Sequence, residues 1–433
     1  MKLPLLPHAK LNDVLSCLAD YDPQAVPVAQ AQDIIEGFIT PIAAVEQLAL
    51  RSALGRVLAK DIQSAINVPA HDNSAMDGYA VVGAQLPEQG ERRFRIVGSA
   101  FAGRAYHGSV EPDECVRIMT GAVMPAGCDT VIPQEFTHAA DAEAISVRAA
   151  VVRSGDNRRL AGEDLAIGKT ALKKGKILRP ADLGLLASLG IAEVPVQRRL
   201  RVAFFSTGDE LRSLGQTLDE GCVYDSNRYT LHGMLTRLGC ELIDMGVVAD
   251  DPAALRAALA CAAENADAII TSGGVSVGAA DYTKQIMAEL GDVAFWTIGM
   301  RPGRPMAFGK IHSQGQSAYL FGLPGNPVAV MVTFLFFVRQ ALLHMAGAHL
   351  APLPLVAAIS PQPIKKRPGR TEYQRGIVSN NASGALEVCV TGAQGSGILR
   401  SMAEANCMIV LDHEQDQVAA GDTVRVILFE GLM

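Results

Sequence analysis

The feature that most constrains this chain's fold is an alternation of apolar runs and helical segments between residues 198 and 346. Five runs have the apolar, β-branched or aromatic character of buried strands: RVAFFST, ELIDMGVV, DAIITS, VAFWTI and AYLFGL. Segments with apolar residues at helical spacing separate or follow them, at 227–238, 252–264, 282–290 and 328–346. Strands that alternate with helices indicate a parallel sheet covered by helices on both faces. We therefore predict a doubly wound α/β domain over residues 198–346.

The segments on either side predict a multidomain α/β protein. Short β-like runs broken by Gly and Pro fill residues 64–151, which indicates an inserted β-rich domain. After a Pro-rich linker, the runs EVCV, CMIVLD and TVRVILF predict a small C-terminal β-barrel over 347–433. The remaining pieces, 1–63 and 152–197, are expected to join in space as one domain built from two segments.

Helical patterns are the main signal in those two pieces. Apolar residues at helical spacing predict helices over 31–38, 43–50 and 181–189. Pro41 suits an early helical position, where its missing N–H costs nothing. We therefore expect this split domain to be helical.

Charge, hydropathy and cysteine usage exclude several classes of protein. The 433 residues carry 38 Lys and Arg against 45 Asp and Glu, a net charge of −7. A general nucleic-acid binder would show a basic surface, so this class is excluded, whereas a local basic pocket for a small anion is not. Mean hydropathy is +0.20, but the longest apolar run, 328–338, falls short of the ~20 residues of a membrane span and predicts a buried helix. The eight cysteines are scattered, with no C-x-x-C, which argues against a zinc site or disulfide framework and favours a reducing cytoplasm.

Carboxylates follow the predicted strands, where ligands of open α/β sheets bind. Asp209 and Glu210 come after the first run, Asp250 and Asp251 after the second, and Asp281 after the third. Neighbouring carboxylates repel one another and attract a cation, and hard oxygen ligands beside a phosphate-bearing substrate suit Mg²⁺. Capping is the alternative for Asp250, Asp251 and Asp281, because each stands near the expected start of a helix.

A glycine-rich loop also follows the third run. Its sequence is Ser272-Gly273-Gly274-Val275-Ser276-Val277-Gly278. Such a loop brings backbone N–H groups close to a phosphate, next to a helix N-terminus. The alternative is that Gly273 and Gly274 only make a tight turn with positive φ.

Proline-containing turns follow the last two runs. Arg301-Pro302-Gly303-Arg304 fixes two cations beside a rigid turn, which suits an oxyanion, although solvated loop arginines would show the same pattern. Pro324-Gly325-Asn326-Pro327 precedes a helix and offers either an anion-accepting N-terminus or only a stiff turn. A basic cluster, residues 365–370, opens the C-terminal domain and is either a solvated face or part of an oxyanion pocket.

Six motifs together resemble those of the molybdopterin molybdenumtransferase family, the MoeA or gephyrin E-domain type. In chain order they are DNSAMDGYA, RIMTGA, STGDEL, TSGGVSVGAADYTK, RPGRPMAFG and GLPGNP. The match covers nearly the whole chain after residue 30, and its order and spacing are specific, although molybdopterin adenylyltransferases share TSGG. The resemblance implies an elongated helical domain built from two segments, an inserted β-rich domain, an α/β molybdopterin-binding domain and a C-terminal β-barrel. It also implies a homodimer whose active cleft is shared between subunits.

The resemblance implies roles for individual residues. Catalytic roles fall on Asp77, Thr120, Glu210, Asp250 and Asp281. The last three of these are the expected ligands of Mg²⁺. Substrate binding is expected at Ser272, Gly273, Gly274, Ser276, Gly278, Arg301, Arg304, Pro324, Asn326, Pro327, Arg370 and Ser401. Arg375 and Ser396 are further candidates for the molybdate pocket.

This sequence departs from the family pattern in two places. Arg301 and Arg304 stand where many relatives carry lysines, and a guanidinium binds an oxyanion as a fork rather than as a point charge. Ala329 stands where relatives often place a serine, so a hydroxyl that could touch molybdate is absent. Both departures concern the molybdate pocket.

We therefore predict a cytoplasmic transferase that converts adenylylated molybdopterin and molybdate into molybdenum cofactor and AMP. A molybdopterin adenylyltransferase is one alternative, but that activity would need only the α/β domain; such an enzyme is also a candidate partner. A non-catalytic scaffold of the same fold is the other, against which the intact carboxylates Asp77, Glu210, Asp250 and Asp281 argue. Neither nucleic acid nor membrane is expected as a partner.

Overall fold

The computed structural model describes residues 10–11, 15, 22–275 and 281–432. The chain divides into two compact units. One comprises Met1–Glu46, Gly55–Ala59 and Val196–Met433, and the other Gln47–Leu54 and Lys60–Pro195. Each unit is described by itself below.

A six-stranded sheet, in the order β16-β13-β17-β21-β20-β18, is the centre of the first unit. The strands are β13 (Arg201–Thr207), β16 (Glu241–Val248), β17 (Ala268–Ser272), β18 (Gly291–Thr297), β20 (Pro305–Ser313) and β21 (Gln316–Leu323). Neighbours from β16 to β21 are parallel, whereas β20 is antiparallel to both β21 and β18. The predicted parallel sheet is therefore mixed. Because β18 is two reversals away from β21, all five predicted strands still end at the same edge.

A tight hairpin explains the reversed strand. Ser313 pairs with Gln316, so the connection between β20 and β21 is the two residues Gln314 and Gly315. Both have positive φ, 46° and 77°, as the favoured two-residue hairpin turns require. The β20 strand was not predicted from the sequence.

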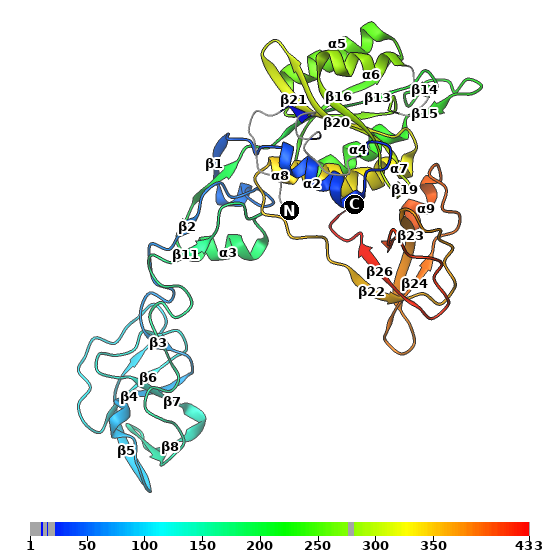
Figure 1. The fold of residues 1–433 in the computed structure, drawn as a ribbon. Helices are drawn as coiled ribbons and strands as arrows, with labels where there is room; N and C mark the ends of the chain where they lie inside the picture. Colours follow the sequence, from blue (N-terminus) through cyan, green and yellow to red (C-terminus); the bar gives the residue numbers. More distant parts are fainter. Residues whose placement is uncertain (1–9, 12–14, 16–21, 276–280, 433) are drawn as a thin grey trace. The chain divides into compact units, whose positions relative to one another are not determined.

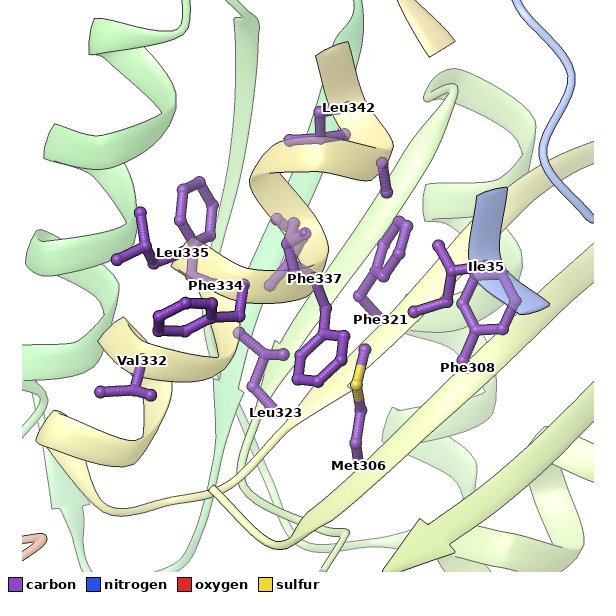
Figure 2. Close-up of a cluster of buried hydrophobic side chains, with 14 of the residues drawn as sticks. Ile35, Met306, Phe308, Phe321, Leu323, Val332, Phe334, Leu335, Phe337 and Leu342 are labelled. Carbon is purple, nitrogen blue, oxygen red and sulfur yellow. The ribbon is translucent and has the colours of Figure 1, made fainter. Parts of the chain in front are cut away.

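Helices cover both faces of the sheet, as predicted (Figure 1). One core cluster joins the sheet to α5 (Pro252–Asn265) and α6 (Asp281–Leu290). A larger cluster on the other face joins it to α2 (Val28–Phe38), α4 (Ser226–Arg237) and a long helix that begins at Pro327. Figure 2 shows part of this second cluster, in which Phe337 of the long helix lies near Phe321 of the sheet and Ile35 of α2 lies near Phe308.

The apolar run at residues 328–338 lies in the long helix of the first unit. This helix consists of α7 (Pro327–Thr333), the π-helical segment η4 (Phe334–Val338) and α8 (Arg339–Met345). By length and composition this is the one helix in the described residues that could cross a membrane, but 78% of its apolar window is buried inside the protein. It is a core helix, as the sequence predicted.

The C-terminal part of the first unit is a closed barrel of five strands, which confirms the prediction. Strands β23-β24-β22-β26-β25 pair in that order, and β25 pairs back to β23. Their bounds are β22 (Val356–Ile359), β23 (Thr371–Asn380), β24 (Leu386–Val390), β25 (Cys407–Leu411) and β26 (Thr423–Leu428), with α9 (Leu399–Glu404) between β24 and β25. Strand β19 (Met300–Arg301) pairs with the start of β23. The aromatic rings of Phe336 and Tyr373 stack 3.9 Å apart. These contacts tie the barrel to the α/β domain.

The second unit contains the predicted β-rich insertion. Its six-stranded sheet has the order β7-β4-β6-β5-β9-β8. The strands are β4 (Gly78–Val81), β5 (Glu91–Ala100), β6 (Glu114–Ile118), β7 (Thr130–Pro133), β8 (Thr137–Asp141) and β9 (Ala144–Arg148). Three short 3₁₀ helices accompany the strands, η1 (Leu50–Ser52), η2 (Gly83–Gln85) and η3 (Gln134–Phe136).

The segments flanking the insertion contain more strand than predicted. Strands from the two segments pair, β2 (Ile62–Gln63) with β11 (Thr170–Leu172), so the segments do meet in space. The others are β1 (Val45–Ala49), β3 (Asn73–Ser74), β10 (Arg158–Arg159) and β12 (Glu193–Gln197). The helix predicted over 43–50 is wrong: β1 alternates in burial with a period of two, which is a strand's period. The helices at α2 and α3 (Pro180–Ser188) are confirmed.

Candidate functional site

A cavity of about 610 Å³ lies at the strand-end edge of the mixed sheet. Of the predicted site residues it is lined by Glu210, Asp250, Ser272, Gly273, Gly274, Asn326 and Pro327. The predicted convergence of strand-end motifs is therefore confirmed for four of the five strands. Ser276 and Gly278 lie outside the described residues, and Asp281 is described only as the first residue of α6.

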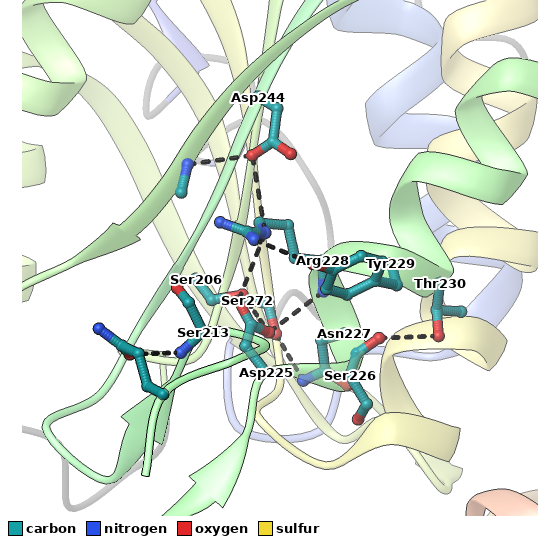
Figure 3. Close-up of polar contacts among 12 residues, drawn as sticks. Ser206, Ser213, Asp225, Ser226, Asn227, Arg228, Tyr229, Thr230, Asp244 and Ser272 are labelled. Atoms are coloured by element: carbon teal, nitrogen blue, oxygen red, sulfur yellow. Dashed lines mark hydrogen bonds and ion pairs between the residues drawn. The ribbon is translucent and has the colours of Figure 1, made fainter.

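The N-terminus of α4 forms one wall of this cavity, which the sequence did not predict. Asp225, 2% exposed, caps the helix by accepting from the Arg228 backbone N–H at 3.2 Å and also accepts from the Ser206 hydroxyl at 2.9 Å. Asn227, two residues later, donates to the Ser272 hydroxyl oxygen at 2.8 Å (Figure 3). The sequence signal was present, since Asp before a helix is a preferred N-cap, but a cap does not by itself reveal a cavity.

The carboxylates at the cavity have different surroundings. Asp251 caps α5 by accepting from the Ala254 backbone N–H at 2.8 Å, so the capping alternative holds for this residue. Asp250 lines the cavity instead, and its carboxylate accepts a hydrogen bond from the Tyr282 hydroxyl. That hydrogen bond, together with burial, raises the pKa of Tyr282 to about 12. Tyr282 is therefore a hydrogen-bond donor to Asp250 throughout the physiological pH range.

The glycine-rich loop makes a tight turn. Gly273 and Gly274 have φ of +92° and +70°, and a Cβ at Gly273 would lie 2.5 Å from the Thr207 carbonyl oxygen. The Gly273 N–H donates to the Leu323 carbonyl at 3.1 Å. Within the described part of the loop, the turn alternative is therefore correct for Gly273, whose N–H is already engaged by the sheet.

At the turn before α7, a backbone N–H group is also already hydrogen-bonded within the protein. Pro327 has no N–H, and the Val328 N–H donates to the Ser396 carbonyl of the barrel at 3.0 Å. The expectation of an anion-accepting helix N-terminus therefore fails at its first two residues. Pro324 is buried and is not among the residues that line the cavity. Asn326 and Pro327 line the cavity through the turn that holds them.

A second cavity, of about 370 Å³, lies where β19 meets the barrel. Arg301, Lys365, Glu372 and Arg375 are its charged lining residues. Two arginines thus face a small space together, as an oxyanion site requires. Arg301 and Arg304 are both exposed, and Arg304 is outside this lining. Ala329, 2% exposed, lines neither cavity, so its missing hydroxyl does not alter their walls.

Arg375 is a buried cation, 1% exposed. Its Nε donates to the Ser401 hydroxyl at 3.0 Å, and its Nη atoms donate to the carbonyls of Ala393, Gln394 and Gly395 at 3.0–3.3 Å. Among the described residues it has no carboxylate partner. Burial, and then the charge of Arg301, lower the pKa of Arg375 to about 10, so it is still charged at neutral pH.

Glu372 is the carboxylate of this second cavity. It is 3% exposed and accepts from Arg370 Nε at 3.0 Å, while Arg301 Nη1 lies 3.9 Å away. Arg370 and Arg301 therefore converge on one buried carboxylate. Ser401, 4% exposed, serves Arg375 rather than the cavity wall.

The two remaining catalytic candidates lie in the second unit and contact each other. Thr120 donates to Asp77 Oδ1 twice, from its backbone N–H and from its hydroxyl, both at 2.7 Å. These two hydrogen bonds, the backbone one first, lower the pKa of the Asp77 carboxyl. The sequence named both residues, and the structure joins them.

The described residues fit Mg²⁺ only in part. No group of three His, Cys, Asp or Glu side chains among them is close enough to hold a metal ion. Two carboxylates, Glu210 and Asp250, do line the first cavity. Mg²⁺ is commonly held by one or two carboxylates together with substrate phosphates, so this donor set suits a metal that arrives with its substrate.

Comparisons with known proteins cover almost the entire chain. Three family models match in succession: the MoeA N-terminal region (domain I and II) at residues 26–190, a probable molybdopterin binding domain at 203–344, and the MoeA C-terminal region (domain IV) at 357–429. The chain is 42% identical to the molybdopterin molybdenumtransferase of Haemophilus influenzae, over 90% of this chain and 95% of that one. It is 35% identical to the enzyme of the same name from a Nostoc species, over 87% of each chain.

Solved structures agree. The fold matches a crystal structure of the molybdopterin biosynthesis moeA protein from Pyrococcus horikoshii with a TM-score of 0.80 and 29% identity, over 94% of this chain and all of that one. A second structure of that protein matches with a TM-score of 0.73 and 30% identity, over 94% and 99%. The chain therefore belongs to the molybdopterin molybdenumtransferase family.

Proposed function

We propose that this transferase inserts molybdate into adenylylated molybdopterin, releasing AMP and forming molybdenum cofactor. The observation that supports this reaction best is the presence of two chemically different cavities in one unit. One is lined by carboxylates and a serine at the ends of parallel strands. The other is lined by arginines beside the barrel. A reaction between a phosphoanhydride and an oxyanion needs both kinds of surface.

The first cavity would hold the phosphates of the adenylylated pterin. Ser272 and the turn at Asn326 are placed to contact them, and Glu210 and Asp250, with Asp281 at the start of α6, are the proposed ligands of Mg²⁺. When bound, Mg²⁺ would neutralise charge that develops as the phosphoanhydride bond breaks. The hydrogen bond from Tyr282 keeps the Asp250 carboxylate oriented.

The second cavity would hold molybdate until the sulfurs of the pterin capture it. Arg301 and Arg375 line it, and Arg370 is oriented beside it by Glu372. A guanidinium without a carboxylate partner attracts an anion most strongly where solvent is scarce. Arg304 lies outside the lining of this cavity and would act on molybdate before it enters rather than after.

We also propose a cytoplasmic homodimer in which Asp77 and Thr120 of one subunit serve the cleft of the other. The proposal rests on the family resemblance of the motifs that carry these residues. Asp77→Ala and Asp281→Ala would each be inactive, but mixing them under subunit exchange should restore about a quarter of wild-type activity, because one cleft in each mixed dimer carries no lesion. A mixture that stays inactive, with exchange confirmed by a tag, would exclude a shared cleft. A molybdopterin adenylyltransferase is the proposed supplier of the substrate.

One assay tests the reaction. The protein is incubated with adenylylated molybdopterin, Mg²⁺ and molybdate, and AMP is measured. We expect AMP release that depends on molybdate and Mg²⁺. ATP-dependent adenylylation of molybdopterin instead would identify an adenylyltransferase, and binding without turnover would identify a scaffold.

A further inference from the structure

Asn227 connects two strand-end loops of the first cavity. It is the second residue of α4 and is 8% exposed. Its Nδ2 donates to the Ser272 hydroxyl at 2.8 Å and to the Gly325 carbonyl at 2.6 Å. Ser272 ends β17 and Gly325 follows β21. One side-chain amide therefore holds the helix and both loops together.

These contacts fix the direction of the hydrogen bond between Asn227 and Ser272. A backbone carbonyl only accepts, so the Gly325 contact places the NH₂ group of Asn227, rather than its oxygen, against both partners. The Ser272 oxygen then accepts from Asn227. A hydroxyl has a single proton, which the hydrogen bond from Asn227 does not use. Ser272 lines the cavity, so this proton is available to an acceptor bound there.

A merely structural asparagine would be expected to satisfy both ends of its amide. Here Oδ1 of Asn227 is buried and has no hydrogen-bond partner in the described residues. Leaving a buried acceptor unpaired lowers stability. The NH₂ group of Asn227 is therefore hydrogen-bonded while its oxygen is left without a partner. The NH₂ group is the end that contacts Ser272.

We propose that Asn227 is a positioning residue that makes Ser272 a hydrogen-bond donor to a phosphate oxygen of the bound pterin. An ionised phosphate oxygen only accepts, so it is matched by a hydroxyl whose proton is free. The inference rests on the proposed function for the identity of the ligand. An aspartate at this position would turn an oxygen toward the Gly325 carbonyl and add charge beside Glu210 and Asp250, which line the same cavity.

The test compares Asn227→Asp, Ser272→Ala and the double variant. We expect each single change to weaken binding of adenylylated molybdopterin roughly tenfold, as loss of a hydrogen bond to a charged group does. The molybdate KM should stay within about twofold of wild type, because the arginine cavity is untouched. The double variant should bind no more weakly than Asn227→Asp alone, because the added charge is present in both and Asn227 otherwise acts through Ser272.

A matched control is Asn265→Asp. Asn265 also donates from Nδ2 to a backbone carbonyl, that of Cys261 at 2.8 Å, but it lies at the exposed end of α5. This variant should bind both substrates as wild type does. Additive losses in the double variant, or equal weakening of pterin and molybdate together with a lower melting temperature, would overturn the proposal.

The same titrations with molybdopterin separate this inference from the proposed function. Molybdopterin carries a terminal phosphate but no adenylyl group. Wild-type protein that binds adenylylated molybdopterin but releases no AMP with molybdate and Mg²⁺ would overturn the proposed reaction, while titrations of the three variants with molybdopterin would still decide the role of Asn227. Unchanged molybdopterin affinity in Asn227→Asp would refute that role whatever the reaction is.

Discussion

Thr120 donates two hydrogen bonds to one oxygen of Asp77, from its backbone N–H and its hydroxyl, each 2.7 Å long. The two residues are 43 positions apart in the chain, just before β4 and just after β6. Both hydrogen bonds favour the ionised carboxylate and lower its pKa. Asp77 therefore stays charged further into the acid range than an ordinary aspartate.

Thr120→Val should move the acid limb of the pH–activity profile to higher pH. Valine keeps the shape and the backbone N–H but removes the hydroxyl donor, so the pKa of Asp77 should rise toward its ordinary value. A carboxylate with a higher pKa is protonated sooner as the pH falls, and activity is lost earlier. The measurement is AMP release as a function of pH.

The control for this prediction is Thr137→Val. Thr137 is half-buried in the same unit, and among the described residues its hydroxyl donates only to the Gln134 carbonyl. Its profile should match that of wild type. An unshifted acid limb in Thr120→Val would mean that Asp77 does not act as a carboxylate in the reaction.

Glu210→Gln and Asp250→Asn should each raise the Mg²⁺ concentration needed for turnover or abolish turnover. Both residues line the strand-end cavity and would lose a charged oxygen there. Folding should be kept, because surface substitutions of this kind usually change stability by less than about 0.5 kcal/mol. Mg²⁺ titrations of AMP release test this, with the exposed Asp219→Asn as control. If these variants keep a normal Mg²⁺ dependence but bind the pterin weakly, the two carboxylates contact the substrate rather than the metal.

Arg301→Ala should raise the molybdate KM more than Arg304→Ala does. Both arginines are exposed, but Arg301 lines the second cavity and approaches the buried Glu372, whereas Arg304 lies outside the lining. Losing a charged hydrogen bond costs ~1.5–3 kcal/mol, and about 1.4 kcal/mol is a factor of ten, so an increase of at least tenfold is expected for Arg301→Ala. Steady-state kinetics at varied molybdate decide the matter. Equal effects, or a matching loss of pterin affinity, would place the phosphates in the second cavity.

Phe337→Ala should destabilise the first unit by ~3–5 kcal/mol, the usual cost of emptying a buried phenylalanine site. Phe337 is 1% exposed in the core cluster between the long helix and the sheet. Chemical denaturation measures the change. Phe101→Ala, at a residue that is 44% exposed, is the matched control and should shift stability by at most about 0.5 kcal/mol.

The architecture could be predicted where local pattern and tertiary environment agree. Buried parallel strands are apolar throughout, so RVAFFST and DAIITS were recognisable as β13 and β17. Strand β20 was missed because PMAFGKIHS follows a Pro-Gly turn and was not separated from it. The segment 43–50 was misread because its apolar residues fit both periods, and only pairing in a sheet selected the strand.

The sequence predicted several residues of the candidate site but not that they line two separate cavities. Strand-end position alone placed Glu210, Asp250 and Ser272 together, and the structure agrees. It could not show that Arg301 faces a separate cavity, because that depends on β19 pairing with the barrel. Asn227 was overlooked because a polar residue in the first turn of a helix looks ordinary without the loops that it holds.

The carbonyl groups around Arg375 have a mechanical consequence. Three consecutive residues, 393–395, point their carbonyls at one guanidinium, and a serine hydroxyl occupies its Nε. The Arg375 side chain therefore holds the backbone of that loop in place through these hydrogen bonds. A lysine, with three donors on a single nitrogen, could not hold the same loop. The positive charge is consequently immobile, so an arriving anion meets a field that is already in place and needs no rearrangement of the protein to create it.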